Sequence, residues 1–468
     1  MEVKNAMEEK NSKWPEIVSR EMEKYRGMMY DAEKFIWSHP QTGFKEWIAH
    51  DFLREKYTAL GFKPVDAGNI PGFFFDIDTG KEGPTVAVLA EMDSIILPEH
   101  PESDPETGAV HACGHNCQSA ALLGVAAVLK EPGILPELCG RIRIMAVPAE
   151  ELIELSDRSA MKAEGTLQSI SGKSEFMRRG FFDGVDLALM IHTDAGRDHK
   201  LRIAPGTNGI IAKRVTYYGS KCHSGAYPTG GVNALSAAQI ALNAINSLRE
   251  VFPEDCLVRH SAVITGAGTT PQFIPGKAVV ESNVRANDYH VLKDINEKIN
   301  RAYAAGALAV GADVEIEDLE MYIPEKDCDC PDFQNIAYEV GCDLFGKENV
   351  CFDRSRTIQN RGGSDMGNVG AVMPVIQPFS SGMGGGCHGA DCEIKYPEYA
   401  VFDPAVVQAA IVCVLLEKGG ARAKKIVGDY QPVFSSIAEY CAAMDHLCAL
   451  KRPVHSENGI SIFNSNEL

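Results

Sequence analysis

The feature that most constrains this chain is an alternation of strand and helix patterns that is interrupted once, in the middle. Runs rich in β-branched and aromatic residues predict strands at "FFFDID", "TVAVLAEMD", "RIRIMAVPAEE" and "DLALMIHTD". Between them, "HNCQSAALLGVAAVL" predicts an apolar helix with Asn116 as its N-cap. Because parallel strands are joined by crossover helices, this order predicts an α/β fold with a doubly wound, mostly parallel sheet.

The interruption has the order β-α-β-β-α-β, which is typical of a ferredoxin-like unit. Its strands are predicted at "IIAKRVTYYG", "CLVRHSAVITG", "KAVVESNVRA" and "DVEIEDLE", with a long helix after the first and another after the third. A chain of 468 residues also exceeds what one core normally supports. We therefore expect an inserted domain at 209–320, between two parts of a discontinuous catalytic domain at 1–208 and 321–468.

Composition and charge exclude several classes of partner. The formal net charge is -19, which argues against nucleic acid, and no basic amphipathic segment is present for a membrane surface. The apolar stretch "AVVQAAIVCVLLEKGG" contains Gln408 and is expected to be too short to span a bilayer. The N-terminus has no apolar signal-peptide core, so a cytoplasmic location is expected, with the 14 cysteines reduced.

Three of the predicted strands end in groups that can bind a metal. One ends in Glu91 and Asp93, the next in Glu150 and Glu151, and a third in His192. A single carboxylate in such a place is more often a solvated or capping group. Because functional groups gather beyond the carboxyl ends of strands in open α/β sheets, three such ends together favour a metal site.

The stretch "HACGH" adds further candidate ligands immediately before the apolar helix. Cys113 and His115 are two residues apart, so in an extended segment their side chains face one site. The positive end of the helix dipole favours a thiolate at Cys113. A set of thiolate, imidazole and carboxylate suits zinc, manganese, cobalt or nickel. His111 is expected to have a structural role instead.

The pair Glu150 and Glu151 permits a division of labour. Adjacent residues on an extended segment point apart, so one carboxylate can bind metal while the other acts as a general base. Two metals about 3.5–4 Å apart lower the pKa of a bridging water to about 7.

Seven motifs occur in an order that resembles family twenty of the metallopeptidases. They are "HACGHN", "PAEE", "IH" after a strand, "CHSGAYPTGGVNAL", "FIPG", "GGSDMGNV" and "CHGADCE". The resemblance extends from about residue 39 to about residue 415. It is greatest to the amidohydrolase branch, which has a cysteine in its "HACGH" motif.

The resemblance implies a site for two divalent metal ions, most often zinc or manganese, with cobalt or nickel as alternatives. Cys113 matches the residue that bridges the metals, and Glu150 matches the general base. Asp93 matches an acid that orients a ligand. The remaining ligands are implied by position: His115, Glu151, His192 and His388.

The resemblance also implies how a small substrate with a free carboxylate is bound. Arg285 matches the arginine that holds this carboxylate, and Gly362 and Gly363 lie in a glycine-rich turn near it. His223 matches a histidine of the inserted lid domain that completes the oxyanion site of the neighbouring subunit, so a homodimer is expected. Gln272 stands where the family usually has asparagine at a substrate contact.

Two features depart from the pattern. Asn116 and Gln118 replace the acid and histidine that usually follow "HACGH", and the segment 94–110 is longer and more polar than in many members. Cys387 is adjacent to His388 and could approach the metals, but a buried reduced thiol is the expected interpretation.

The predicted activity is hydrolysis of the amide bond of an N-acyl or N-aroyl amino acid, such as aminobenzoyl-glutamate, or of a dipeptide. The attacking group would be a metal-bridging hydroxide. Two alternatives remain: another hydrolysis at the same two-metal site, such as deamination of a small amine, and a non-catalytic binding protein on this scaffold.

Overall fold

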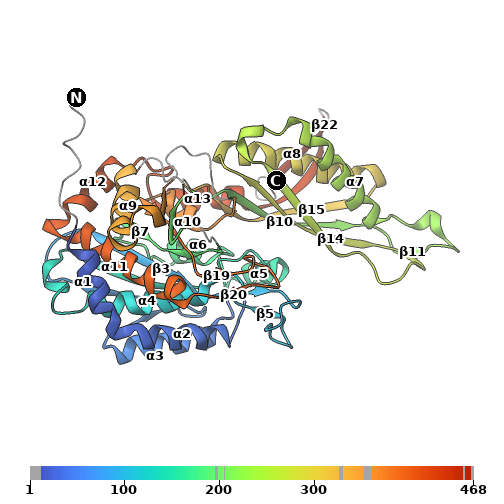
Figure 1. Cartoon of the computed structure of the whole chain (residues 1–468). Helices are drawn as coiled ribbons and strands as arrows, with labels where there is room; N and C mark the ends of the chain where they lie inside the picture. The colour runs from blue at the N-terminus through green and yellow to red at the C-terminus, as the bar shows by residue number, and fades with distance from the viewer. Residues whose placement is uncertain are drawn as a thin grey trace.

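A six-stranded mixed sheet forms the centre of the first part of the molecule (Figure 1). The computed structural model describes residues 12–195, 199–204, 206–325, 330–352, 361–456 and 459–464. The strand order is β1-β2-β6-β3-β7-β17. The strands β6, β3, β7 and β17 are parallel to one another, β2 is antiparallel to β6, and β1 is antiparallel to β2. The strands are β1 (Val65–Asp66), β2 (Phe73–Asp78), β3 (Thr85–Glu91), β6 (Arg141–Val147), β7 (Leu187–Leu189) and β17 (Val375–Ile376).

Helices cover both faces of this sheet, because its central strands are apolar on both sides. All seven residues of β3 are buried. Val86 and Val88 pack into one core, while Ala87 and Leu89 pack into a second. The first core is covered by α1 (Trp14–Met22), α2 (Arg26–Trp37), α3 (Trp47–Ala59), α4 (His115–Leu129), α9 (Pro331–Phe345), α11 (Asp403–Leu416) and α12 (Ala421–Asp429). The second core includes α6 (Gly172–Arg178), α10 (Met366–Gly370) and α13 (Ile437–Leu447). The doubly wound α/β prediction is thus confirmed.

The interruption folds into a second, antiparallel sheet of order β12-β14-β10-β15-β21-β22. Its first four strands in chain order are β10 (Gly209–Tyr218), β12 (Arg259–Gly266), β14 (Lys277–Ala286) and β15 (Asp313–Tyr322). With α7 (Ala234–Ser247) and α8 (Tyr289–Val310), they have the predicted β-α-β-β-α-β order. A small two-stranded sheet of β11 (Cys222–His223) and β13 (Phe273–Ile274) extends from the far end of this unit (Figure 1).

The end of the chain returns to this second sheet, although 321–468 was assigned as a whole to the catalytic domain. The strand β21 (Leu450–Ser456) pairs antiparallel with β15, and β22 (Gly459–Asn464) pairs with β21. Lys451 donates to the buried carboxylate of Asp318 at 2.5 Å, and Asp318 also binds Lys213. This long-range pairing had no counterpart in the local sequence pattern.

The apolar stretch before residue 417 differs from its prediction as well. Helical structure is continuous over Glu398–Leu416, and by length and composition this segment could cross a membrane. However, 94% of its apolar window is buried inside the fold, as in the core helix of a globular protein. Gln408 does not interrupt it, because its Nε2 donates to the carbonyl of Pro404 at 3.2 Å within the same helix.

Smaller elements complete the framework around the strand ends. A four-stranded sheet has the order β16-β9-β18-β8, with bounds Val350–Phe352, Leu201–Ile203, Phe379–Ser380 and His192–Thr193. Two short hairpins lie beside it, β4 (Ile95–Ile96) with β5 (Ala109–Val110), and β19 (Met383–Gly384) with β20 (Glu393–Ile394). The remaining α-helix is α5 (Leu155–Ala163), which follows the turn after β6.

Candidate metal centre

The chain segments that follow β3 and β6 leave the same edge of the sheet. These strands are parallel and adjacent, with Glu91 opposite Val147. Asp93 follows β3, and the backbone N–H of Glu151 donates to Asp93 Oδ2 at 2.9 Å. The parallel register therefore brings the acids of two predicted strand ends into direct contact.

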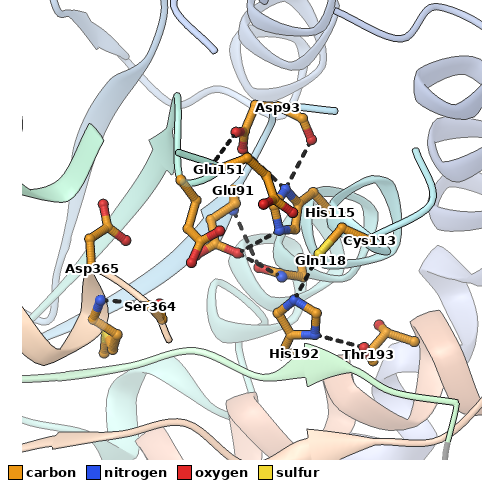
Figure 2. Close-up of polar contacts among 12 residues, drawn as sticks. Glu91, Asp93, Cys113, His115, Gln118, Glu151, His192, Thr193, Ser364 and Asp365 are labelled. Atoms are coloured by element: carbon orange, nitrogen blue, oxygen red, sulfur yellow. Dashed lines mark hydrogen bonds and ion pairs between the residues drawn. The ribbon is translucent and has the colours of Figure 1, made fainter. Parts of the chain in front are cut away.

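His115 is clamped between these acids at the first turn of α4 (Figure 2). Its Nδ1 lies 2.9 Å from the carbonyl oxygen of Asp93 and 3.0 Å from Asp93 Oδ1. Its Nε2 lies 3.1 Å from Glu91 Oε2, and all three side chains are fully buried. Gly114 precedes it with φ of 90°, and a Cβ there would lie 3.0 Å from Met383 Sδ, so a glycine is needed to place the ring.

Cys113 lies beside His192, and the two side chains point toward each other (Figure 2). The Cys113 Sγ lies 3.4 Å from His192 Nε2. His192 Nδ1 lies 2.6 Å from the carbonyl oxygen of Thr193, which directs Nε2 toward the sulfur. In a metal-binding histidine, one ring nitrogen is typically hydrogen-bonded to a carbonyl while the second ring nitrogen faces the metal and its other ligands. His192 has this arrangement.

A strained turn aims Glu150 and Glu151 into the site. Ala149 has φ of 54°, which is unfavourable for a residue with a Cβ. The buried carboxylate of Glu46 accepts the Ala149 N–H at 2.7 Å, and Tyr322 donates its hydroxyl to the carbonyl of Glu150. Glu46 was not predicted to have any role, since nothing in its local sequence distinguishes it from a surface acid.

The two adjacent glutamates have different charge environments. Burial raises the pKa of Glu150 well above its usual value, and Glu91 and Glu151 add to this effect. Burial also acts to raise the pKa of Glu151, but the neighbouring His388 and His115 outweigh it, so that this pKa is lowered. Glu151 Oε1 lies 2.8 Å from His388 Nε2. The carboxyl group of Glu151 is therefore paired with histidine cations, whereas that of Glu150 is not.

The donor atoms of these residues form overlapping groups within 4.8 Å. One group is Cys113, His115 and His192, and a second is Cys113, Cys387 and His388. A third joins His115 to Glu150 and Glu151. Cys113 belongs to two of these groups, and His115 also belongs to two.

Three buried donor atoms test whether cations fit here, because they have no hydrogen bond and only ion-pair contacts of 2.8–3.1 Å. They are Asp93 Oδ1, His115 Nε2 and Glu151 Oε1. Buried polar atoms normally have partners, and a mixture of thiol, imidazole and carboxylate is a divalent-metal donor set. The residues present thus fit divalent metal ions.

A buried lysine that the sequence did not reveal lies beside this group. The Nζ of Lys173 forms ion pairs with Glu91 and Asp365, and all three side chains are inaccessible to solvent. The backbone N–H of Lys173 also donates to Asp365 Oδ2 at 2.9 Å. Glu91, Glu150 and Asp365 themselves form a group within 4.8 Å, so this cation offsets a cluster of buried carboxylates.

Arg285 lies on the second sheet, where that sheet faces the glutamates. Arg285 is opposite Ile210, and Ile210 is opposite Tyr322, so the three side chains share one face. Tyr322 contacts Glu150, and Glu150 and Glu151 are the acids that act electrostatically on Arg285. Among the described residues, the guanidinium has no ion pair or hydrogen bond, although burial lowers its pKa.

The glycine-rich turn lies next to this arginine. A Cβ on Gly363 would lie 2.5 Å from Ile210 Cδ1, and Gly362 accepts the N–H of Asn208 at 2.8 Å through its carbonyl. Gly363 therefore allows the turn to pack closely against the start of β10, one strand away from Arg285.

His223 and Gln272 are not brought to the metal centre of their own chain. His223 lies in β11 and Gln272 directly precedes β13, and both are exposed. The small sheet that these two strands form lies at the far end of the second sheet (Figure 1). The N–H of Ser224 donates to the Gln272 carbonyl at 2.9 Å, so the two residues occupy one small structure. Cys387, expected to be buried, is exposed.

Comparison with known proteins agrees with this architecture. The profile of a family described as "Peptidase dimerisation domain" matches residues 206–309, which include β10, β12 and β14 of the second sheet and α7. Xaa-Arg dipeptidase of Mus musculus is 27% identical over 362 residues, covering 74% of each chain. A p-aminobenzoyl-glutamate hydrolase polypeptide from Escherichia coli is 25% identical over 68% of this chain and 63% of its own length.

These matches support the M20 metallopeptidase family for this chain. The homologues are hydrolases and peptidases that act on amide bonds, and the chain is a hydrolase of this kind. A crystal structure described as that of a dinuclear metal binding peptidase from the M20 family, from Bacillus subtilis, has the same fold. It has a TM-score of 0.60, 18% identity and coverage of 84% of this chain and 99% of that one.

Proposed function

We propose that this M20 protein is a dinuclear metal-dependent amidohydrolase that cleaves an N-acyl or N-aroyl amino acid, or a dipeptide. The observation that supports this most is the convergence of five donor residues beside one glutamate and one arginine that have no ion pair among the described residues. The donors are Cys113, His115, Glu151, His192 and His388. The relatives named for Xaa-Arg dipeptidase and p-aminobenzoyl-glutamate hydrolase activities fit this substrate class.

The ligand arrangement determines which groups remain available for chemistry. When bound, zinc or manganese would polarise the amide carbonyl and acidify the attacking water; cobalt or nickel could also occupy the site. Glu150 would accept the proton of that water and deliver it to the leaving amine. Asp93 would hold His115 in one orientation through its contact with Nδ1.

The second sheet would supply the recognition of the substrate. Arg285 would form a bidentate pair with its free carboxylate, with the turn at Gly362 and Gly363 alongside. His223 and Gln272 lie at the β11–β13 sheet, away from the metal centre of their own chain. We therefore propose that they reach the site of a second subunit in a cytoplasmic homodimer. In that arrangement His223 would donate a hydrogen bond to the developing oxyanion.

The function is tested by a substrate screen. Metal-free protein is reconstituted with zinc, manganese or cobalt and incubated with N-acyl amino acids, aminobenzoyl-glutamate and dipeptides. We expect metal-dependent release of the free amino acid. Release of ammonia from amines without amide cleavage would contradict the proposal, as would fewer than one metal ion per chain after reconstitution.

Arg285→Ala should weaken the use of substrates that carry a free carboxylate. Loss of a hydrogen-bonded charge pair costs about 1.5–3 kcal/mol, or about 10- to 150-fold in kcat/KM. The effect should appear mainly in KM, and Arg285→Lys should recover part of it. As a control, the substrate with its carboxylate converted to an amide should be hydrolysed at the same rate by both forms; an equal loss on that substrate would exclude carboxylate recognition.

A further inference from the structure

Cys387 lies at the metal centre, in the loop between β19 and β20 that also carries His388. Its Sγ, the Cys113 Sγ and a ring nitrogen of His388 all lie within 4.8 Å of one another. Cys387 is thus a second sulfur at the centre, which neither the motif set nor the comparisons assign to it.

Backbone contacts hold this loop across the "HACGH" segment. The N–H of His388 donates to the carbonyl of Ala112 at 2.8 Å, and the thiol of Cys392 donates to the same oxygen at 3.5 Å. His388 has φ of 60°, a conformation that persists only when the surroundings impose it. The hydrogen bond from residue 388 to residue 112 therefore places residue 387 opposite residue 113.

The loop makes the two sides of the centre chemically different. On one side, Cys113 meets two imidazoles, those of His115 and His192. On the other side, the contact of 2.8 Å between Glu151 and His388 adds an oxygen and a nitrogen to the two sulfurs. Two thiolates, one imidazole and one carboxylate form a four-ligand set typical of zinc, which can also accept a fifth ligand.

We propose that Cys387 is an additional protein ligand on the Glu151/His388 side of the centre, and that its thiolate gives this side a preference for zinc over manganese. The inference rests on the proposed function only in that the site holds divalent ions. Soft thiolate ligands favour zinc, whereas carboxylate and water favour manganese. The other donors of this side do not discriminate as strongly, so the second sulfur determines the preference.

Cobalt binding tests the proposal without measuring activity. Metal-free protein, kept reduced with a phosphine, is titrated with Co²⁺ to two ions per chain, and the sulfur-to-cobalt charge-transfer absorption is recorded. With Cys113 bridging, the wild type has three sulfur–cobalt bonds, so Cys387→Ser should lower the absorption by about one third. Cys392→Ser changes a thiol of the same loop outside the cluster, and because serine can still donate to the carbonyl of Ala112, the absorption should be unchanged.

A second variant is needed in case Cys387→Ser does not bind metal. Cys387→Asp keeps a donor but replaces sulfur by oxygen. It should bind two ions, show the same reduced absorption and shift the zinc-to-manganese preference toward manganese by about ten-fold in a competition titration. Wild-type absorption and wild-type preference in both Cys387 variants would overturn the proposal.

The outcome is separable from that of the proposed function. An active amidohydrolase whose charge-transfer absorption does not depend on Cys387 would contradict only the ligand assignment. A protein that binds cobalt through Cys387 but cleaves no amide would contradict only the function.

Discussion

Glu150→Gln is expected to lower kcat by about 10³-fold while both metal ions remain bound, within the range of about 10²–10⁴ for general acid–base catalysis. The carboxylate of Glu150 lies within 4.8 Å of donor atoms of His115 and Glu151, yet it has no hydrogen bond among the described residues. Glu150 is 8% exposed, so a small part of this residue is open to solvent. Glutamine keeps the size and polarity of this side chain but cannot accept a proton.

The neighbouring glutamate provides the matched control. Glu151 contacts His388 at 2.8 Å and is placed among the ligands, so Glu151→Gln should lower the metal content as well as the rate. Single-turnover kinetics together with elemental analysis separates the two effects. Substantial turnover by the Glu150 variant would rule out this residue as the base, and loss of metal from it would assign Glu150 to the ligands instead.

Lys173→Met is expected to destabilise the protein by about 3–5 kcal/mol, the usual cost of removing one partner of a buried ion pair. The ammonium group forms ion pairs with Glu91 and Asp365, with all three side chains inaccessible to solvent. Methionine fills a similar volume, so the main loss is the compensating charge. Urea or thermal unfolding of the metal-free protein measures the effect.

Acid provides a second measure of this cluster. Burial acts to raise the pKa of Glu91, but Lys173, His115 and His192 outweigh it and lower this pKa to about 2. A depressed carboxyl pKa contributes stability above its unfolded value of 4.5, and this stability is lost as the pH falls toward 2. In Lys173→Met, the contribution should be lost at higher pH, because the principal cation is missing.

Two controls test the physical cause. Lys425→Met changes an exposed lysine that pairs with Asp332 and Asp429, and it should have little effect on unfolding. Adding Glu91→Gln to Lys173→Met should recover part of the stability, because it removes one uncompensated charge. If the double variant is less stable than Lys173→Met, charge compensation is not the reason for the loss.

Local pattern predicted much of the architecture because burial is periodic in the sequence. The run "TVAVLAE" is apolar at nearly every position, and β3 is buried on both faces as that pattern requires. The β-α-β-β-α-β order was predicted in the same way. The N-cap of α4 was predicted wrongly: the helix begins after Gly114, and Asn116 donates to the buried Glu33 at 2.9 Å instead.

The residues of the candidate site also fall into two groups, those that local sequence could reveal and those that it could not. The donors Cys113, His115 and His192 lie next to predicted strand ends or a helix start, so their types and positions could be found from the sequence. Lys173, Glu46 and Cys387 could not be found in this way. Each acts through a partner that is distant in the chain, and a lysine, a glutamate and a cysteine in isolation look like surface charges or a packed thiol.

By itself, the sequence determined most of the strands and helices, that the strand ends carry candidate metal donors, and that the middle forms a separate sheet. These properties follow from periodicity and from the order of elements along the chain. Only the tertiary structure decided that β21 joins the second sheet, that Lys173 compensates the buried acids, and that Cys387 faces Cys113. Each of these depends on contacts between segments far apart in sequence, and local preference does not encode such distances.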